Sequence, residues 1–171
     1  SSIIIPEGVT EIGYGTFYDC KSLETIAIPK TVTSIENTAF SGCCSLTSIS
    51  LPDGIPYINY GLFSGCSSLT SISIPESVTI IANDAFYGCS SLTNVTIPKN
   101  VTKIGNCAFE GCERLTSVTL PESLKIIYSA VFRNCEELLD VYCYAEALPE
   151  MGVKVFENSY ETNSLCDCSP K

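Results

Sequence analysis

The sequence repeats with a period of 23, and this period limits the possible folds more than any other feature of the chain. Four positions of the period keep one residue type through six copies. They are proline at Pro6, Pro29, Pro52, Pro75, Pro98 and Pro121, isoleucine at Ile12, Ile35, Ile58, Ile81, Ile104 and Ile127, phenylalanine at Phe17, Phe40, Phe63, Phe86, Phe109 and Phe132, and leucine at Leu23, Leu46, Leu69, Leu92, Leu115 and Leu138. A segment of this length cannot bury its own apolar side chains, so the copies must stack and share one elongated core. The sequence therefore predicts a solenoid.

Each copy contains the patterns of two strands and one turn. The segment T-S-I-S-I alternates polar and apolar residues and is rich in β-branched side chains, which predicts a half-buried strand. The proline that follows has no N–H for the ladder and ends this strand. A shorter extended piece, V-T-x-I, comes next, with Val9 and Ile12 as its first inward pair. The segment A-F-x-G-C is then expected to form a single helical turn.

The residue before each repeated cysteine is expected to have a positive φ angle. This column contains Asp19, Gly42, Gly65, Gly88, Gly111 and Asn134. Gly, Asn and Asp tolerate the left-handed conformation better than other residues. The column is therefore predicted to cap the turn and to direct the chain toward the next strand.

The consensus L-x-x-I-x-I-P-x-x-V-T-x-I-G-x-x-A-F-x-G-C closely resembles the BspA-like, or Treponema-type, leucine-rich repeat family over residues 1–143. The resemblance implies a right-handed, curved, β-rich solenoid with a parallel sheet on its concave side and short helical turns. It also implies secreted or surface-attached proteins of host-associated anaerobes, which adhere to host matrix proteins, to other bacteria or to glycans.

Two regions are predicted. Residues 1–143 form six full leucine-rich repeats with this period of 23, the first of which begins in mid-repeat, and residues 144–171 form an irregular seventh turn and a C-terminal cap or tail. Phe156 follows Phe132 by one residue more than the period, which places Asn158 in the cap column and Ser159 in the cysteine column. Because the chain begins in mid-repeat, we expect it to be a piece of a longer protein, with an uncapped N-terminal edge that allows end-to-end association.

Composition and charge exclude several kinds of function. The formal net charge of −10 argues against a nucleic-acid partner, which needs clustered Lys and Arg. His is absent, so imidazole catalysis is excluded. No apolar run is long enough to span a membrane, and no signal peptide is present in this chain. The missing signal peptide says little about where the chain works, and the family resemblance alone implies an extracellular or cell-surface location.

Six cysteines lie in one column of the repeat: Cys20, Cys43, Cys66, Cys89, Cys112 and Cys135. The favoured interpretation is a ladder of buried thiols that fill space and form weak hydrogen bonds to the turn backbone. Disulfides between some rungs, or a metal or redox role, are the alternatives. A linear ladder does not converge on a metal, so no metal site is expected. The tail pair Cys166 and Cys168 is interpreted as an unstructured pair, a disulfide or a metal-binding pair, in that order.

The candidate ligand-binding residues face outward from the predicted concave sheet. If Leu23, Ile26 and Ile28 point inward, the alternate residues of each strand form a surface rich in hydroxyl groups. We name this surface the hydroxyl band, and it consists of Ser48, Ser50, Ser71, Ser73, Asn94, Thr96, Ser117, Thr119, Asp140, Tyr142 and Tyr144. The alternative interpretation is a set of cross-strand Ser/Thr ladders that only suit a solvated sheet face.

Tyrosines form a second candidate group, in variable columns away from the main strand. Its members are Tyr14, Tyr18, Tyr57, Tyr60, Tyr87 and Tyr128. The alternative interpretation is that these side chains pack partly against the rim of the solenoid and bind nothing.

The sequence favours a noncatalytic cell-surface or secreted module that binds a protein or glycan of a host or a bacterium. The alternative is a structural spacer arm of a larger surface protein, with no ligand of its own. An enzyme is not expected, because the outward columns of the main strands contain one acidic residue, Asp140, and paired carboxylates would be needed. No cofactor is expected.

Overall fold

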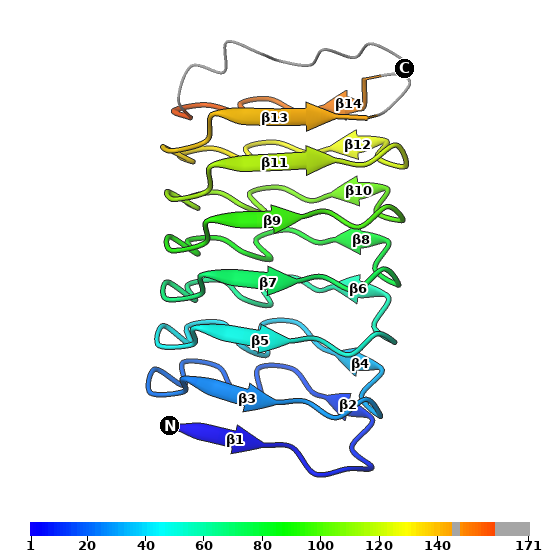
Figure 1. Cartoon of the computed structure of the whole chain (residues 1–171), viewed down its shortest axis with the longest axis vertical. Coiled ribbons are helices and arrows are strands. Elements are labelled where there is room, and N and C mark those ends of the chain that lie inside the picture. The colour runs from blue at the N-terminus through cyan, green and yellow to red at the C-terminus, as the bar shows by residue number, and fades with distance from the viewer. Residues whose placement is uncertain (145–147, 160–171) are drawn as a thin grey trace.

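The computed structural model describes residues 1–144 and 148–159, through which the chain rises as a stack of similar turns (Figure 1). Each turn contributes one strand to a main face and one shorter strand to a second face, and the neighbouring strands of each sheet are parallel. The predicted solenoid of about six turns with a 23-residue spacing is therefore confirmed.

The strands of the main face coincide with the predicted T-S-I-S-I segments. They are β1 (Ser2–Ile4), β3 (Thr25–Ala27), β5 (Ser48–Ser50), β7 (Ser71–Ser73), β9 (Asn94–Thr96), β11 (Ser117–Leu120) and β13 (Asp140–Cys143). In each of these strands from β3 to β13 a buried residue lies between two less buried ones, because successive side chains point to opposite faces, whereas the central Ile3 of β1 is half-buried.

The strands of the second face lie on the other side of the core and run in the opposite direction in the view of Figure 1. They are β2 (Glu11–Ile12), β4 (Ser34–Ile35), β6 (Tyr57–Ile58), β8 (Ile80–Ile81), β10 (Lys103–Ile104), β12 (Ile126–Ile127) and β14 (Glu150–Met151). Their isoleucine column points inward, and Ile35, Ile58 and Ile81 are buried.

The expected helical turn is wrong, since no helix occurs in the part of the chain that the structure describes. Alternate amides of this segment bond to the next turn: the Phe40 N–H donates to the Leu62 oxygen at 3.1 Å, whereas the Ser41 N–H donates to the Thr38 oxygen at 3.0 Å. An α-helix would use these amides within its own segment. Half of the backbone N–H groups that a helix would need therefore donate to the next turn of the stack instead.

The turn contains two columns of positive φ, of which the sequence analysis predicted one. The predicted cap column is confirmed at all six positions and also at Asn158, where φ is 57°. The second column lies four residues earlier and consists of Gly15, Thr38, Gly61, Asp84, Cys107, Ala130 and Lys154. Two left-handed residues so close together are incompatible with a right-handed helical turn.

A continuous stack of phenylalanine rings forms the centre of the core. Neighbouring rings from Phe17 to Phe156 have centroids 5.0 to 5.6 Å apart and are nearly parallel, at 5° to 15°. These separations lie in the favourable range for offset aromatic pairs. Phe156 extends the stack into the seventh turn although this turn is one residue longer.

Both sheets are interrupted at the same boundary, between the second and third turns. β1 pairs with β3 and β2 with β4, but the five-stranded sheets begin at β5 and β6. On the second face the cause is Pro56, which occupies the position of Thr33 and Thr79. The Thr33 and Thr79 amides each donate to the preceding turn at 2.9 Å, and proline has no such donor. The Asn59 side chain compensates in part, since its Nδ2 donates to the Ile35 oxygen at 2.7 Å.

Candidate functional site

All eleven residues of the hydroxyl band lie on the outer side of β5, β7, β9, β11 and β13 and the segment just after β13. The ladder places Ser48 beside Ser71, Ser71 beside Asn94, and Asn94 beside Ser117. Most of these side chains are exposed, while Ser117 and Thr119 are half-buried. The sequence pattern thus predicted correctly which residues share this face, and their binding role stays a prediction.

The band hydroxyls differ from the threonines beside them in their hydrogen bonds. Thr70 and Thr93 donate through Oγ1 to the backbone oxygen of the preceding turn, each at 3.3 Å. Within residues 1–144 and 148–159, the hydroxyls of Ser48, Ser71 and Ser73 have no protein partner. The structural hydroxyl ladder is therefore the neighbouring threonine column, and the band keeps its hydroxyls free.

The C-terminal end of the band changes from small side chains to an acidic and aromatic group. Asp140 lies beside Ser117, and Tyr142 lies beside Thr119, in the ladder between β11 and β13. Tyr142 is 51% exposed and Tyr144 is 63% exposed. The Tyr144 N–H donates to the Leu120 oxygen at 3.1 Å, which holds its backbone beside the sheet. This group can offer two aromatic faces and one carboxylate to a ligand.

The repeated cysteines form a hydrogen-bonded ladder inside the core. Each thiol from Cys43 to Cys135 is buried and donates to the backbone oxygen of a phenylalanine in the preceding turn, at 3.1 to 3.4 Å. Ser159, predicted to occupy the same column, donates in the same way to the Phe132 oxygen. The interpretation as buried thiols is confirmed for these five members of the column, whereas Cys20 is only half-buried. The nine cysteines that the structure describes are free, and Cys166 and Cys168 lie outside the described residues.

Burial also decides the chemistry of these thiols. It raises the pKa of Cys43 to about 11 and the pKa values of Cys89 and Cys135 to about 12, and it also raises the pKa values of Cys66 and Cys112 well above the ordinary value of a thiol. A nucleophilic cysteine needs a thiolate, which a lowered pKa favours. The cysteine column is therefore part of the packing and does not supply a catalytic group.

The six tyrosines of the second candidate group are all exposed, and they do not form one site. Tyr14 is 77% exposed and Tyr18 is 60% exposed, both in the first turn. Tyr57 lies in β6, away from the main-face strands as expected. Tyr60 and Tyr128 border one groove on the second face, which the other four tyrosines do not line.

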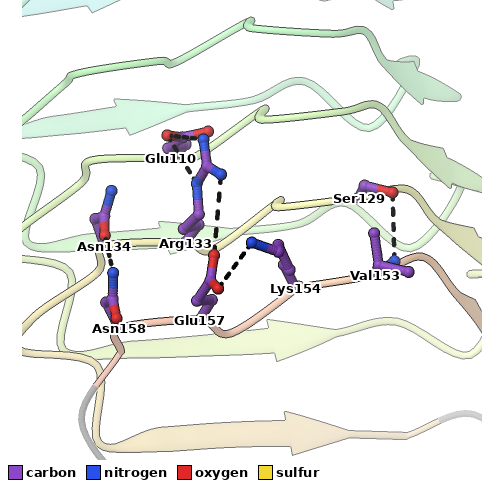
Figure 2. Close-up of polar contacts among 8 residues, drawn as sticks. All are labelled: Glu110, Ser129, Arg133, Asn134, Val153, Lys154, Glu157 and Asn158. Atoms are coloured by element: carbon purple, nitrogen blue, oxygen red, sulfur yellow. Dashed lines mark hydrogen bonds and ion pairs between the residues drawn. The ribbon is translucent and has the colours of Figure 1, made fainter.

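The sequence analysis missed a ladder of alternating charges in the last turns (Figure 2). Glu110, Arg133 and Glu157 occupy one column of the repeat. Glu110 Oε1 accepts from Arg133 Nε at 3.0 Å and Nη2 at 2.6 Å, and Glu157 Oε1 lies 3.0 Å from Lys154 Nζ. Glu110 is 5% exposed, and its Oε2 is buried without a partner among the described residues. Comparing the repeats column by column would have revealed this alternation.

A side-chain ladder of asparagines was missed as well. The Oδ1 atoms of Asn37, Asn83 and Asn106 accept from the backbone N–H groups of Tyr60, Asn106 and Ser129, at 2.8 to 3.1 Å. These side chains accept hydrogen bonds from backbone N–H groups that lie outside the strand ladders, so the role of the asparagine column is structural. Its signal in the sequence is the recurrence of asparagine at a single position of the repeat in three of the turns.

In the described ranges, no group of three or more His, Cys, Asp or Glu side chains is arranged to hold a metal ion. Across the same ranges, no helix has the length and apolar character needed to cross a membrane.

The sequence matches one family model, and the structure resembles several solved structures. Residues 1–90 and 57–166 match the BspA-type leucine-rich repeat region in six copies. The T. pallidum leucine-rich repeat protein is 31% identical, with a TM-score of 0.84 over 99% of this chain and 86% of that protein. No curated protein sequence matches the chain.

Two further solved structures extend this comparison. A leucine-rich repeat protein from Bacteroides ovatus is 31% identical, with a TM-score of 0.75 over 92% of this chain, which spans 49% of that protein. A leucine-rich cell surface protein from Faecalibacterium prausnitzii is 24% identical, with a TM-score of 0.52 over 83% of this chain and 59% of that protein, and it shows a likeness of fold alone. These matches indicate no enzyme family.

Proposed function

Because the chain belongs to the BspA-type leucine-rich repeat family, we propose that it is a noncatalytic binding module of the cell surface or of a secreted protein. In this proposal it adheres to a protein or glycan of a host or a bacterium through the hydroxyl band. The right-handed, curved form that the family resemblance implies is part of the proposal, since curvature would make the band concave and suited to an extended partner.

The free hydroxyls of the band are the observation that supports this proposal most. The threonines next to the band bond to the preceding turn, whereas Ser48, Ser71 and Ser73 have no protein partner in the described part of the chain. Exposed hydroxyls at regular strand spacing can donate and accept along a partner without any rearrangement of the sheet. The fold therefore presents a pre-organised polar surface.

The aromatic end of the band supplies the anchors that a hydroxyl surface lacks. Tyrosine offers a large contact area together with a polar group, and such residues are enriched at binding interfaces. Tyr142 and Tyr144 lie on the same side of the chain as Asp140 and are half exposed or more. We expect this group to provide most of the affinity and the hydroxyls to provide register along the partner.

The proposed location rests on the comparisons. The F. prausnitzii structure is described as a leucine-rich cell surface protein. That likeness is one of fold, so the surface role proposed for the present chain rests on its membership of the BspA-type leucine-rich repeat family.

The proposal predicts that binding depends on the two ends of the band in different ways. The protein would be tested against immobilised extracellular matrix proteins and an array of glycans. The triple variant Asp140→Ala, Tyr142→Ala, Tyr144→Ala is expected to lose at least about tenfold in affinity, because hot spots of this kind each contribute more than about 1 kcal/mol. The variant Ser50→Lys, Ser73→Lys, Thr96→Lys is expected to lose affinity through charge and bulk on the band.

Tyr87→Ala provides the matched control, because Tyr87 is exposed to a similar degree, at 45%, but lies away from the band. Thermal unfolding of each variant would show that the fold is retained. Binding that survives both band variants, or that falls as much in Tyr87→Ala, would contradict the proposed site.

A further inference from the structure

The second face carries a groove that the hydroxyl band does not share. Its volume is about 410 Å³, and it lies over β8 and β10, whose sheet is on the other side of the core from the band (Figure 1). The residues that matter for its chemistry are Tyr60, Ala82, Asn83, Lys103, Gly105 and Tyr128. A ligand in this groove would not touch the proposed adhesion surface.

Tyr60 and Tyr128 lie at the two ends of the groove in turn order, and we call the lining residues at the levels between them the floor, which includes Ile80, Ile81, Ala82 and Gly105. Tyr60 is 50% exposed and Tyr128 is 41% exposed. They come from the third and the sixth turn, whose levels differ by roughly 14 Å at the usual strand spacing. Ala82 and Gly105 lie between them. A Cβ atom at Gly105 would lie 2.5 Å from the backbone nitrogen of Asn83, so this part of the floor must remain without a side chain.

The polar groups of the groove are donors. Lys103 is exposed and pairs in the sheet with Ile80 on one side and Ile126 on the other, and it has no ion pair within residues 1–144 and 148–159. Asn83 uses Oδ1 to accept from the Asn106 N–H at 2.8 Å, which leaves its Nδ2 donors free among the described residues. No Asp or Glu lines the groove, although the chain has a net charge of −10.

We propose that this groove binds an acidic carbohydrate, an oligosaccharide that carries a carboxylate or sulfate group. The apolar C–H face of a sugar ring packs against Tyr60 or Tyr128, and a ring hydroxyl accepts from Asn83 Nδ2. The anionic group pairs with Lys103, which is the one charged residue of the lining. An anion avoids repulsion here because carboxylates are absent from the lining, while most of the charged surface is acidic.

An acidic peptide fits this groove less well than an acidic glycan. β8 and β10 are interior strands of their sheet, so a peptide cannot add to them as a further strand. The floor combines small residues with Ile80 and Ile81 and offers no deep pocket for an anchoring side chain. The apolar faces of flat sugar rings can pack on this mainly apolar lining and on the tyrosines, while their polar edges meet Lys103 and Asn83.

The test uses an array on which uronate, sialic acid and sulfated oligosaccharides are each paired with a neutral counterpart. We expect the protein to bind at least one acidic glycan more tightly than its neutral partner. In solution, Lys103→Gln is expected to weaken binding of that acidic glycan by about fivefold at low salt, and to leave the neutral partner unaffected. Tyr60→Ser and Tyr128→Ser are each expected to weaken binding of the acidic glycan by about tenfold.

Matched controls come from the chain itself. Tyr14→Ser removes an exposed tyrosine from the same column as Tyr60, and Lys99→Gln removes an exposed lysine, both outside the groove. These variants, and the triple variant at Asp140, Tyr142 and Tyr144, are expected to bind the acidic glycan like the wild type. Unchanged unfolding temperatures would show that all variants are folded.

Five outcomes would overturn the inference. Four of them are a lack of binding to every acidic glycan on the array, equal binding of acidic and neutral partners, a loss of binding in the control variants that matches the loss in the groove variants, and binding of polyglutamate where acidic glycans do not bind. Loss of binding in the hydroxyl-band variant alone would place the ligand in the band, which contradicts the groove and leaves the proposed function intact.

Discussion

The thiol of Cys89 donates to the Phe63 oxygen, and burial raises its pKa to about 12 from an ordinary value of 9.0. In the unfolded chain this thiol ionises near its ordinary pKa, while in the folded chain it stays protonated. The unfolded state therefore binds fewer protons between about pH 9 and 12. We predict that the free energy of unfolding falls through this range, by about 1.4 kcal/mol per pH unit for each such thiol.

Lysine and tyrosine side chains also titrate in this pH range, but they are the same in the wild type and in Cys89→Ser. The difference in stability between the two proteins therefore reports the ionisation of the Cys89 thiol. Ser159 shows that a hydroxyl in this column makes the same hydrogen bond to a phenylalanine oxygen, so we expect the variant to fold. Urea unfolding at pH values of about 7.5, 9 and 10.5 would compare it with the wild type. The wild type should lose more stability with rising pH, and parallel curves would contradict the prediction.

At the scale of the element, the charge ladder of the last turns combines one buried carboxylate with partly exposed partners. Glu110 is buried, and both described hydrogen bonds of its carboxylate come from Arg133 (Figure 2). Removing one partner of a buried pair leaves the other charge without compensation. We predict that Arg133→Gln lowers the free energy of unfolding more than Glu110→Gln does, as measured in urea. A larger loss of stability in Glu110→Gln than in Arg133→Gln would contradict the prediction that the buried Glu110 carboxylate depends on Arg133.

The inward columns were predictable because each inward side chain must match those in the turns before and after it. Phe63 stacks on both Phe40 and Phe86, so a change at any one position disturbs two contacts. The outward positions of the hydroxyl band were predictable for a related reason, since a strand with one buried face must alternate. The regular sequence therefore predicts which side chains pack in the core and toward which face of the sheet each side chain points.

The second positive-φ column was not predictable in this way. Gly15 and Asp84 suit the left-handed conformation, but Ala130 and Lys154 do not favour it. The bonds between turns impose this conformation: the Ala130 N–H donates to the Val153 oxygen at 3.0 Å. The groove between Tyr60 and Tyr128 was equally hidden, because it depends on side chains from four turns that share no repeated pattern.

At the scale of the whole molecule, the interruption after the second turn divides the stack into two sheet systems. Pro56 removes one donor from the second face at this boundary, and the main-face ladder is also absent there. We predict that amides of β4 exchange with deuterium faster than those of β8 and β10. Pro56→Thr restores a donor opposite the Thr33 oxygen and is expected to slow exchange at β4.

Thr79→Ser is the control for this experiment, because the equivalent residue of the next turn keeps its backbone donor. It should leave exchange at β4 unchanged. If amides of β4 and β8 exchange at the same rate in the wild type, the interruption does not weaken the stack.

The strand pairing shows where the extra residue of the seventh turn is inserted. Cys143 pairs with Leu120 at the ordinary spacing, whereas Glu150 pairs with Ile126, which is one residue further away. The extra residue therefore falls between Cys143 and Glu150 in the sequence, and Phe156 still stacks on Phe132 at 5.5 Å. The corner, meaning the connection between a main-face strand and the next second-face strand, can therefore gain a residue while the phenylalanine core keeps its register. Foreign peptides grafted at the equivalent corners of other turns would be displayed as a regularly spaced array on a scaffold that keeps its own register.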